Sequence, residues 1–145
     1  MEMSLNLLAV QDQITAKLNE LPQDVYETAV PENTKVKNSN GLFLPYVVVF
    51  YGDMAESTRG KGITSVRDNV GVSYALVRCI APTERAARQV AGLVRDKLVG
   101  FKATDAGEMR LAAGGRNYVD TDGNGSPERF VAEIPFTFIV NTVVS

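Results

Sequence analysis

Three oxygen-bearing side chains, Asp120, Asp122 and Asn124, alternate along a short polar run with the spacing of calcium ligands in an EF-hand loop. Gly125 follows where such a loop turns sharply, but the twelfth position holds Val131 and not the bidentate glutamate that the loop requires. Asp, Asn and Gly also favour a tight hairpin turn. We therefore interpret the run as a turn, and keep a small calcium-binding module as the alternative from another functional class.

A glycine-rich run at residues 60–62 includes a lysine and has the residue types of a phosphate-binding loop. A P-loop places Ser or Thr directly after its Lys, between a strand and a helix, whereas Gly62 and then Ile63 follow Lys61 here. Nucleotide binding is therefore not expected at this run. Its basic side chains are left to meet solvent or an acidic surface of a partner.

The chain contains no histidine and a single cysteine, Cys79. The absence of histidine removes the commonest neutral-pH general base and the commonest metal ligand, so Ser-His-Asp, Cys-His and His-metal mechanisms are excluded. Cys79 has no histidine to activate it, and we interpret it as a small buried apolar side chain. One cysteine also excludes an internal disulfide. We expect no enzymatic activity, no metal site and no cofactor.

Two groups of side chains have the types found in nucleic-acid binding sites. One group is basic and falls on a predicted helix: Arg85, Arg88, Arg95 and Lys97. The other is aromatic and falls on predicted strands: Tyr46, Phe50, Tyr51 and Tyr74. Acidic residues interleave with the basic group, and the chain has 15 Lys and Arg against 17 Asp and Glu, a net charge of -2. We therefore interpret the basic group as a solvated helix face with ion pairs and the aromatic group as core packing.

Two amphipathic helices are predicted to carry part of the core. Apolar residues recur at three- and four-residue steps over residues 7–21 and again over residues 82–101. Pro22 marks the end of the first helix. Pro82 is expected in the first turn of the second, where proline is tolerated, and Thr83 supplies capping chemistry.

Strands are predicted where apolar and β-branched residues are dense or alternate. Long strands are expected over residues 45–51, 70–80 and 130–140, and short ones over residues 25–28, 35–36, 109–113 and 117–120. Pro135 cannot donate to a ladder, so its strand is expected near a sheet edge with Pro135 facing solvent or a bulge. Between the first two long strands, residues 53–69 are expected to form a long loop or an extended hairpin arm.

The order helix, strands, helix, strands predicts an α+β fold, an antiparallel β-sheet with two α-helices packed on one face. At 145 residues, with 45% hydrophobic and 22% charged residues, the chain has the composition of one globular domain spanning residues 1–145. The N-terminal segment lacks the basic stretch and the apolar run of a signal peptide or membrane span. We expect a soluble protein made in a cytoplasm.

Five segments, taken in their order and spacing, carry a resemblance to a known family. They are Pro45 to Val49 with Tyr51-Gly52; Ala81-Pro82-Thr83-Glu84-Arg85-Ala86-Ala87-Arg88; Leu98-Val99-Gly100-Phe101; Gly114-Gly115 before Tyr118; and Ser126-Pro127-Glu128-Arg129-Phe130 leading into Glu133 and Phe136-Thr137-Phe138. Over roughly residues 5–142 this order resembles the tail terminator proteins of long-tailed, siphovirus-type bacteriophages.

The resemblance implies a structural virion protein of the tail or neck, assembled in the host cytoplasm. Such a subunit forms a ring, expected to be a homohexamer, that caps the head-proximal end of the tail tube and stops tube polymerisation. The implied partners are other copies of the chain, the tail tube protein and a head-completion or connector protein, while DNA passes through the ring without specific binding. The alternative within this class is a head-tail connector or tail-completion neck protein.

A ring needs a heterologous interface, in which one patch of a subunit meets a different patch of the next. The arm at residues 53–69 is a first candidate because it carries charges of both signs. Its candidate interface residues are Arg59, Lys61, Ile63, Arg67 and Asp68. Pairing between edge strands is a second candidate, through residues 35–36 or the strand that contains Pro135.

Overall fold

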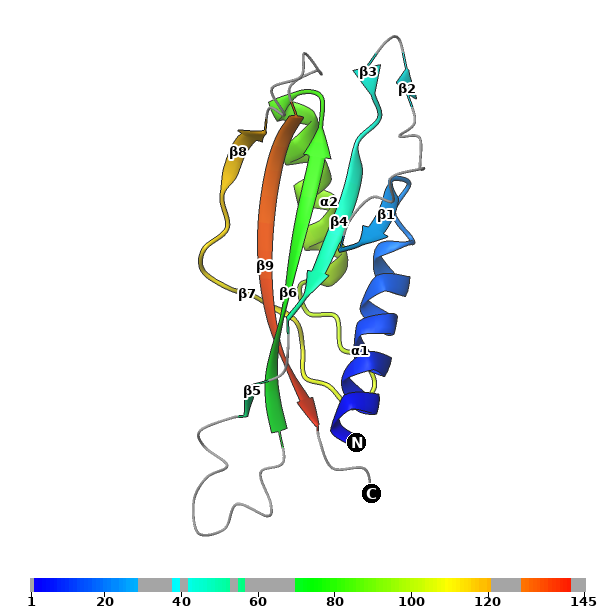
Figure 1. The fold of residues 1–145 in the computed structure, drawn as a ribbon, viewed down its shortest axis with the longest axis vertical. Coiled ribbons are helices and arrows are strands. Elements are labelled where there is room, and N and C mark those ends of the chain that lie inside the picture. The colour runs from blue at the N-terminus through cyan, green and yellow to red at the C-terminus, as the bar shows by residue number, and fades with distance from the viewer. Residues whose placement is uncertain are drawn as a thin grey trace.

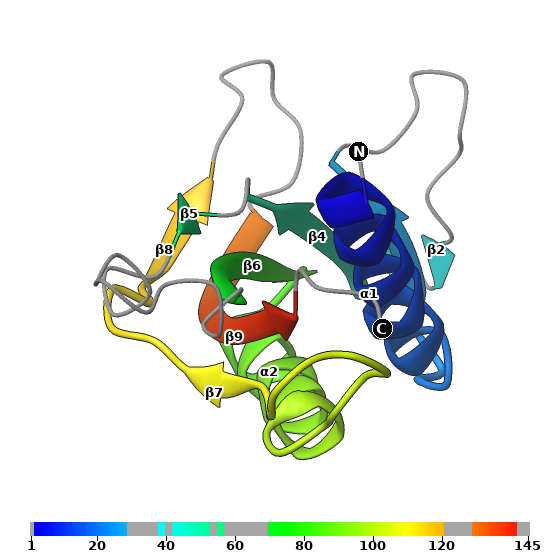
Figure 2. The same cartoon turned by 90° about the horizontal axis from the view of Figure 1, so that it is seen from below.

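Seven strands form one sheet in the described part of the chain, and both helices pack against the same face of it (Figures 1 and 2). The computed structural model describes residues 2–28, 38–39, 42–52, 55–56, 70–120 and 129–141. The helices are α1, Glu2–Leu18, and α2, Glu84–Leu98. The strands are β1, Asp24–Glu27; β2, Asn38–Ser39; β3, Leu42–Phe43; β4, Tyr46–Tyr51; β5, Ala55–Glu56; β6, Val70–Ala81; β7, Arg110–Leu111; β8, Asn117–Asp120; and β9, Arg129–Asn141.

The sheet has the order β1-β4-β6-β9-β7, with β5 paired to β6 and β8 paired to β9. The α+β prediction is confirmed, with one difference: β1 runs parallel to β4, while the other described pairings of this sheet are antiparallel. Residues 28–45 separate β1 from β4, and parallel neighbours need a connection of about a dozen residues or more to bring the chain back. The small hairpin of β2 and β3 lies within this connection.

Helix α1 buries one stripe of apolar side chains, as its periodicity predicts. Val10, Ile14 and Leu18 recur at four-residue steps and are buried in the main core. The helix ends at Leu18, and Leu21 is buried in the bend before Pro22. The predicted helix therefore exists, but its last predicted turn belongs to the connection that leads into β1.

Helix α2 has the expected cap and the expected buried stripe. The Thr83 side chain is the N-cap and accepts a hydrogen bond of 3.1 Å from the Ala86 backbone N–H. Pro82 therefore lies one residue before the N-cap. The prediction that it lies in the first turn of the helix is wrong. At the other end, Gly100 has a φ of 83° just after the C-cap Val99, a conformation that glycine adopts without a steric cost.

The two longest strands, β6 and β9, pair over twelve residues and form the centre of the sheet. The helix-facing side of β9 carries large side chains such as Ile134 and Phe136, whereas that of β6 carries small ones such as Ala75 and Cys79. Small side chains on β6 let α2 pack close to the middle of the sheet.

Neither described helix has both the length and the apolar character that crossing a bilayer requires.

The strand that contains Pro135 lies one position in from the edge of the sheet, because β7 and β8 both pair with it. Between these two short strands the chain bulges: the Ala112 N–H donates to the Pro135 carbonyl, and the Glu133 N–H donates to the Arg116 carbonyl. A Cβ on Gly115 would lie 2.8 Å from the Glu133 carbonyl oxygen, so the close approach requires glycine. The prediction that Pro135 faces solvent or a bulge near a sheet edge is confirmed in its second form, and β9 is not itself an open edge where β7 and β8 pair with it.

Candidate interaction surfaces

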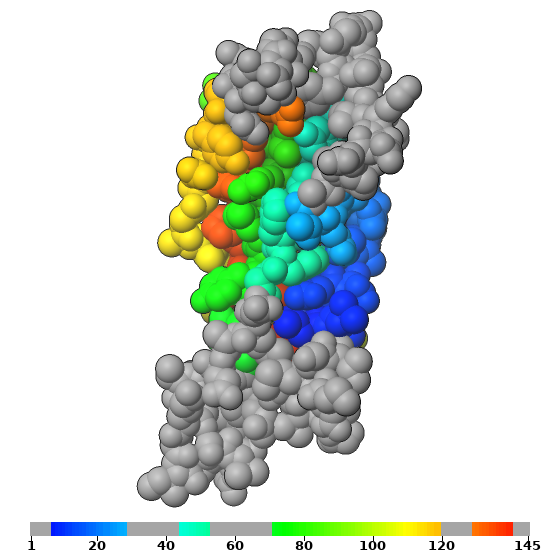
Figure 3. All heavy atoms as spheres, viewed as in Figure 1, coloured from blue at the N-terminus to red at the C-terminus, as the bar shows by residue number. Residues whose placement is uncertain are grey.

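The sheet face opposite the helices, which is turned toward the viewer in Figure 3, carries its own apolar cluster. Its members come from five strands and are Tyr26, Tyr46, Val48, Phe50, Ile80, Tyr118 and Val131. The rings of Tyr26 and Tyr46 meet edge to face, with centroids 6.0 Å apart and an interplanar angle of 82°. This helix-free face is therefore aromatic at its centre, where the described helices leave it uncovered.

A buried carboxylate between two arginines lies on the same face. Glu133 of β9 is 8% exposed, and it accepts a hydrogen bond of 2.7 Å from the Nε of Arg78 and one of 2.8 Å from the Nε of Arg116. Each guanidinium also lies over an aromatic ring, Arg78 over Phe50 and Arg116 over Tyr118, both 4.7 Å from the ring centroid. These five side chains tie β4, β6, β8 and β9 together across the helix-free face.

The charge of Glu133 is maintained by its two partners. Burial acts to raise the pKa of Glu133, but the hydrogen bonds and positive charges of Arg116 and Arg78 outweigh it, so the pKa lies below its usual value. The same contact raises the pKa of Arg116. The cluster, which we call the Glu133 node, therefore carries one net positive charge at neutral pH.

Sequence reasoning did not single out the Glu133 node. The sequence signals only Arg78, which interrupts the apolar series of β6, whereas Glu133 lies on the side of β9 that alternates with its apolar series. The two become partners only through the register that places them opposite each other. Without that register, nothing in the spacing joins them to each other or to Arg116.

The aromatic side chains expected in the core divide between the two sheet faces. Tyr46 is buried, and Phe50 and Tyr51 are half-buried, in agreement with core packing. Tyr51 reaches the helix side, where its hydroxyl donates to the Gln11 carbonyl of α1. Tyr74 is 52% exposed, so the prediction is wrong there; it lies on the helix-free face, which no described helix covers.

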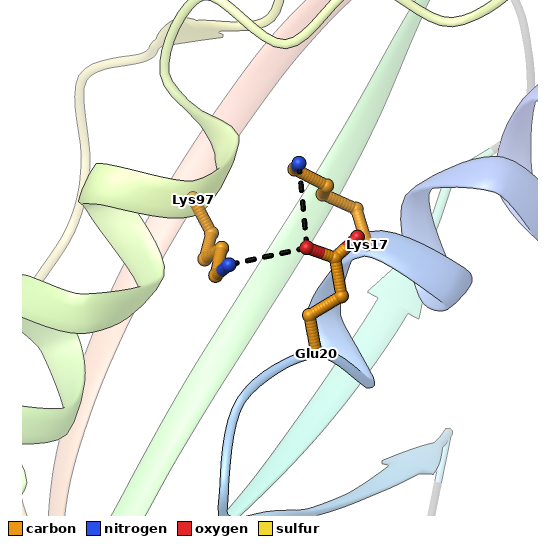
Figure 4. A network of polar contacts seen from close by, with 3 residues as sticks. All are labelled: Lys17, Glu20 and Lys97. Carbon is orange, nitrogen blue, oxygen red and sulfur yellow. Dashed lines mark hydrogen bonds and ion pairs between the residues drawn. The ribbon is translucent and has the colours of Figure 1, made fainter.

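Two of the four basic side chains of α2, Lys97 and Arg88, form ion pairs with described residues, as the sequence predicts, and Arg85 and Arg95 form none with them. Lys97 lies 3.1 Å from the carboxylate of Glu20, which also lies 3.5 Å from Lys17, so the three residues join α2 to the end of α1 (Figure 4). Hydrogen bonding to Lys97 and the charge of Lys17 lower the pKa of Glu20. On the other flank of α2, Arg88 lies 3.9 Å from Glu84.

That other flank of α2 lines a groove beside the β7–β8 edge of the sheet. One cavity of about 130 Å³ lies between the start of α2 and β8, and it is lined by Ala87, Arg88 and Val119 among others. A second cavity of about 310 Å³ lies at the bulge and is lined by Arg95 and Leu111 among others. Figure 2 shows β7 and β8 reaching beyond α2 on this side. We call this surface the α2–β8 groove.

Several predictions fall wholly or partly outside the described residues. The proposed interface residues Arg59, Lys61, Ile63, Arg67 and Asp68 lie outside them, as do Asp122, Asn124 and residues 35–36. The described start of the arm, β5, pairs antiparallel with β6. Asp120 ends β8, and no group of three potential metal ligands occurs among the described residues.

Two other predictions of the sequence lie within the described residues. Cys79 is buried, and burial raises the pKa of its thiol to about 12, in agreement with an apolar role. Pairing of a neighbour's strand with the strand of Pro135 is wrong over the stretches that β7 and β8 cover, because those strands already use the outer edge of β9.

Comparisons with known proteins show what this fold is similar to. No protein-family model matches the sequence, and no curated protein matches it. Among solved structures, the fold is similar to that of a chain described as "Virion of native gene transfer agent (GTA) particle", with a TM-score of 0.58 and 15% sequence identity. The similarity covers 93% of this chain and 97% of that chain. At this identity it establishes a shared fold.

Proposed function

We propose that this chain is a structural virion protein that forms a ring and caps the head-proximal end of a phage tail tube. The observation that carries the proposal is the fold shared with a virion chain over almost the full length of both chains. The ordered segments that resemble tail terminators supply the finer assignment.

The proposed protein acts through surface contacts and not through catalysis. The chain has no histidine, and two of its described carboxylates, Glu20 and Glu133, are paired with lysine or arginine, so no acid-base pair is recognisable among the described residues. Its described surface instead offers an aromatic sheet face, a groove beside α2 and short strands at the sheet edge. The proposed partners are further copies of the chain, the tail tube protein and a head-completion protein, with DNA passing through the ring.

Electron microscopy of particles assembled without this protein tests the proposal. Loss of a tail terminator leaves tube growth unchecked, so overlong or irregular tails are expected. Normal-length tails that fail to join heads would identify a connector or tail-completion protein instead. Particles of wild-type dimensions and full infectivity would refute a structural role in the virion.

A further inference from the structure

The helix layer of this subunit stops short of the sheet edge. Helices α1 and α2 pack on the sheet over β1, β4, β6 and β9, but β7 and β8 have no described helix over them. Two apolar side chains of these edge strands are consequently half exposed, Leu111 at 50% and Val119 at 48%. They line the two cavities of the α2–β8 groove. The groove is therefore the place that a third helix of the layer would occupy.

The wall that α2 contributes to this groove is basic. Arg88 and Arg95 lie seven residues apart, two helical turns, and so share one flank of α2. Arg88 lies 3.9 Å from the exposed carboxylate of Glu84, at the limit of an ion pair, whereas Arg95 takes part in no ion pair with the described residues. An occupant of the groove would thus contact apolar edge strands on one side and cationic side chains on the other.

The outer face of α1 has the complementary properties. Its exposed residues recur at three- and four-residue steps and are Leu8, Ala9, Asp12 and Ala16. Leu8 is 55% exposed, the two alanines allow close approach, and Asp12 supplies a negative charge. We call this surface the α1 stripe.

The α1 stripe and the α2–β8 groove lie on opposite flanks of one helix layer. The Lys97 side of α2 faces α1 through Glu20, and the Arg88 and Arg95 side faces the groove, so the order across the layer is α1, α2, groove. Two different patches on opposite flanks are what a heterologous, ring-forming interface requires. A symmetric dimer would instead use one patch twice.

We infer that the α1 stripe of one copy docks in the α2–β8 groove of the next, with Asp12 beside Arg95 and Leu8 over the exposed apolar residues of β7 and β8. The helix layers of successive copies then join into one continuous belt. This inference rests on the proposed ring, and it names the surfaces that hold the ring together. It assigns the interface to described residues and gives the arm at residues 53–69 no required part.

A charge-swap experiment tests the inference. Asp12→Arg and Arg95→Glu each place like charges across the interface, and each is expected to weaken self-association by about tenfold or more. The double variant restores an opposite-charge pair between neighbours and is expected to recover most of the loss. Arg85→Glu, on the outer face of α2, makes the same change in charge outside the groove and should leave assembly unchanged. Melting temperatures establish that each variant is folded.

A cross-linking experiment tests the same contact without charge. Ala16→Cys and Val119→Cys place accessible thiols on the two surfaces, while the native Cys79 is buried and does not compete. With a flexible bismaleimide, the double variant is expected to give a ladder of covalent multimers, whereas each single variant gives none. The mass of each species is measured by light scattering across concentration, alone and with tail tube protein.

The outcomes separate this inference from the proposed function. Rings that persist in both single charge variants, or that give no ladder in the double cysteine variant, overturn the interface and leave the tail-capping role intact. A wild-type chain that forms no ring, alone or on tail tubes, overturns both. Charge rescue together with a ladder supports the interface.

Discussion

Replacing Glu133 with glutamine tests whether the Glu133 node stabilises the sheet. Glu133→Gln keeps the size of the side chain and removes its charge, which leaves Arg78 and Arg116 facing a neutral amide. The glutamine oxygen can still accept a hydrogen bond from one arginine. The NH₂ group is a donor and cannot accept a hydrogen bond from the other arginine. The folded state therefore loses two charge-assisted hydrogen bonds, whose donor–acceptor distances are 2.7 and 2.8 Å in the wild type.

The expected loss follows from the exposure of the two partners. A hydrogen bond to a charged group contributes about 1.5–3 kcal/mol. The Arg116 side chain is 68% exposed and the Arg78 side chain 35%, so water replaces a large part of what each guanidinium loses. Two such bonds at the low end of the range sum to about 3 kcal/mol, and the exposure of the two arginines reduces the expected destabilisation to about 2 kcal/mol. For a domain of this size that lowers the melting temperature by about 6–8 °C.

The pH dependence gives this prediction its sharpest form. Because the pKa of Glu133 is lower in the folded than in the unfolded protein, its contribution is fully present above the unfolded pKa, about 4.3. The contribution disappears as the pH falls through the lower, folded pKa. The wild type should therefore exceed Glu133→Gln in stability at pH 7, and the gap should close in strong acid.

Urea denaturation of both proteins at several pH values measures this gap. The control is Glu84→Gln, whose carboxylate is 66% exposed and 3.9 Å from Arg88, and which should change stability by under about 0.5 kcal/mol. Equal stabilities of wild type and Glu133→Gln at pH 7 would refute the reasoning. A gap of constant size down to strong acid would show that packing and not charge is responsible.

Three further predictions concern single positions outside the node. Gly115→Ala should destabilise the fold by about 1–3 kcal/mol, because its Cβ would lie 2.8 Å from the Glu133 carbonyl oxygen. An unchanged urea midpoint would contradict this prediction. The control is Gly92→Ala, whose Cβ would have open space around it. Thr83→Ala should cost about 1 kcal/mol by removing the N-cap of α2, whereas Thr83→Ser should cost less, as denaturation midpoints will show. Cys79 should react with a thiol reagent at pH 8 only on unfolding, since burial raises its pKa to about 12; rapid labelling of the native protein would disagree.

Local pattern predicts the helices and long strands of this fold well, because each of them buries a periodic stripe. Helix α2 illustrates this: Val90, Val94 and Leu98 appear in the sequence at four-residue steps, and all three are buried. The cap at Thr83 is likewise a local signal, since its side chain bonds an amide only three residues away.

Features that depend on which strands become neighbours are not visible in local pattern. The direction of β1 depends on a long connection, and the cover over β9 depends on two short strands that return to the same edge. The Glu133 node has the same origin, because Arg78 and Glu133 lie 55 residues apart and meet through strand register. The α2–β8 groove is still harder to predict from local sequence pattern. It exists because α2 lies over β6 and β9 and not over the edge strands.

The alternation of β6 shows why hydrophobicity alone cannot assign the two faces of this sheet. Its larger side chains, Tyr74, Leu76 and Ile80, point away from the helices, while the smaller Ala75 and Cys79 face them. Hydrophobicity would assign the bulky side to the core, but a helix that crosses the middle of a sheet needs short side chains beneath it to pack closely.

The bulky side is thereby left for a second role. It carries an aromatic cluster, braced by the Glu133 node, on a face that no described helix covers. A subunit that assembles through its surface must present an ordered face to its surroundings, and ordering that face in advance reduces the entropy lost on contact. The Glu133 node supplies that order. Glu133→Gln should therefore weaken contacts made by the helix-free face under conditions in which the subunit is still folded.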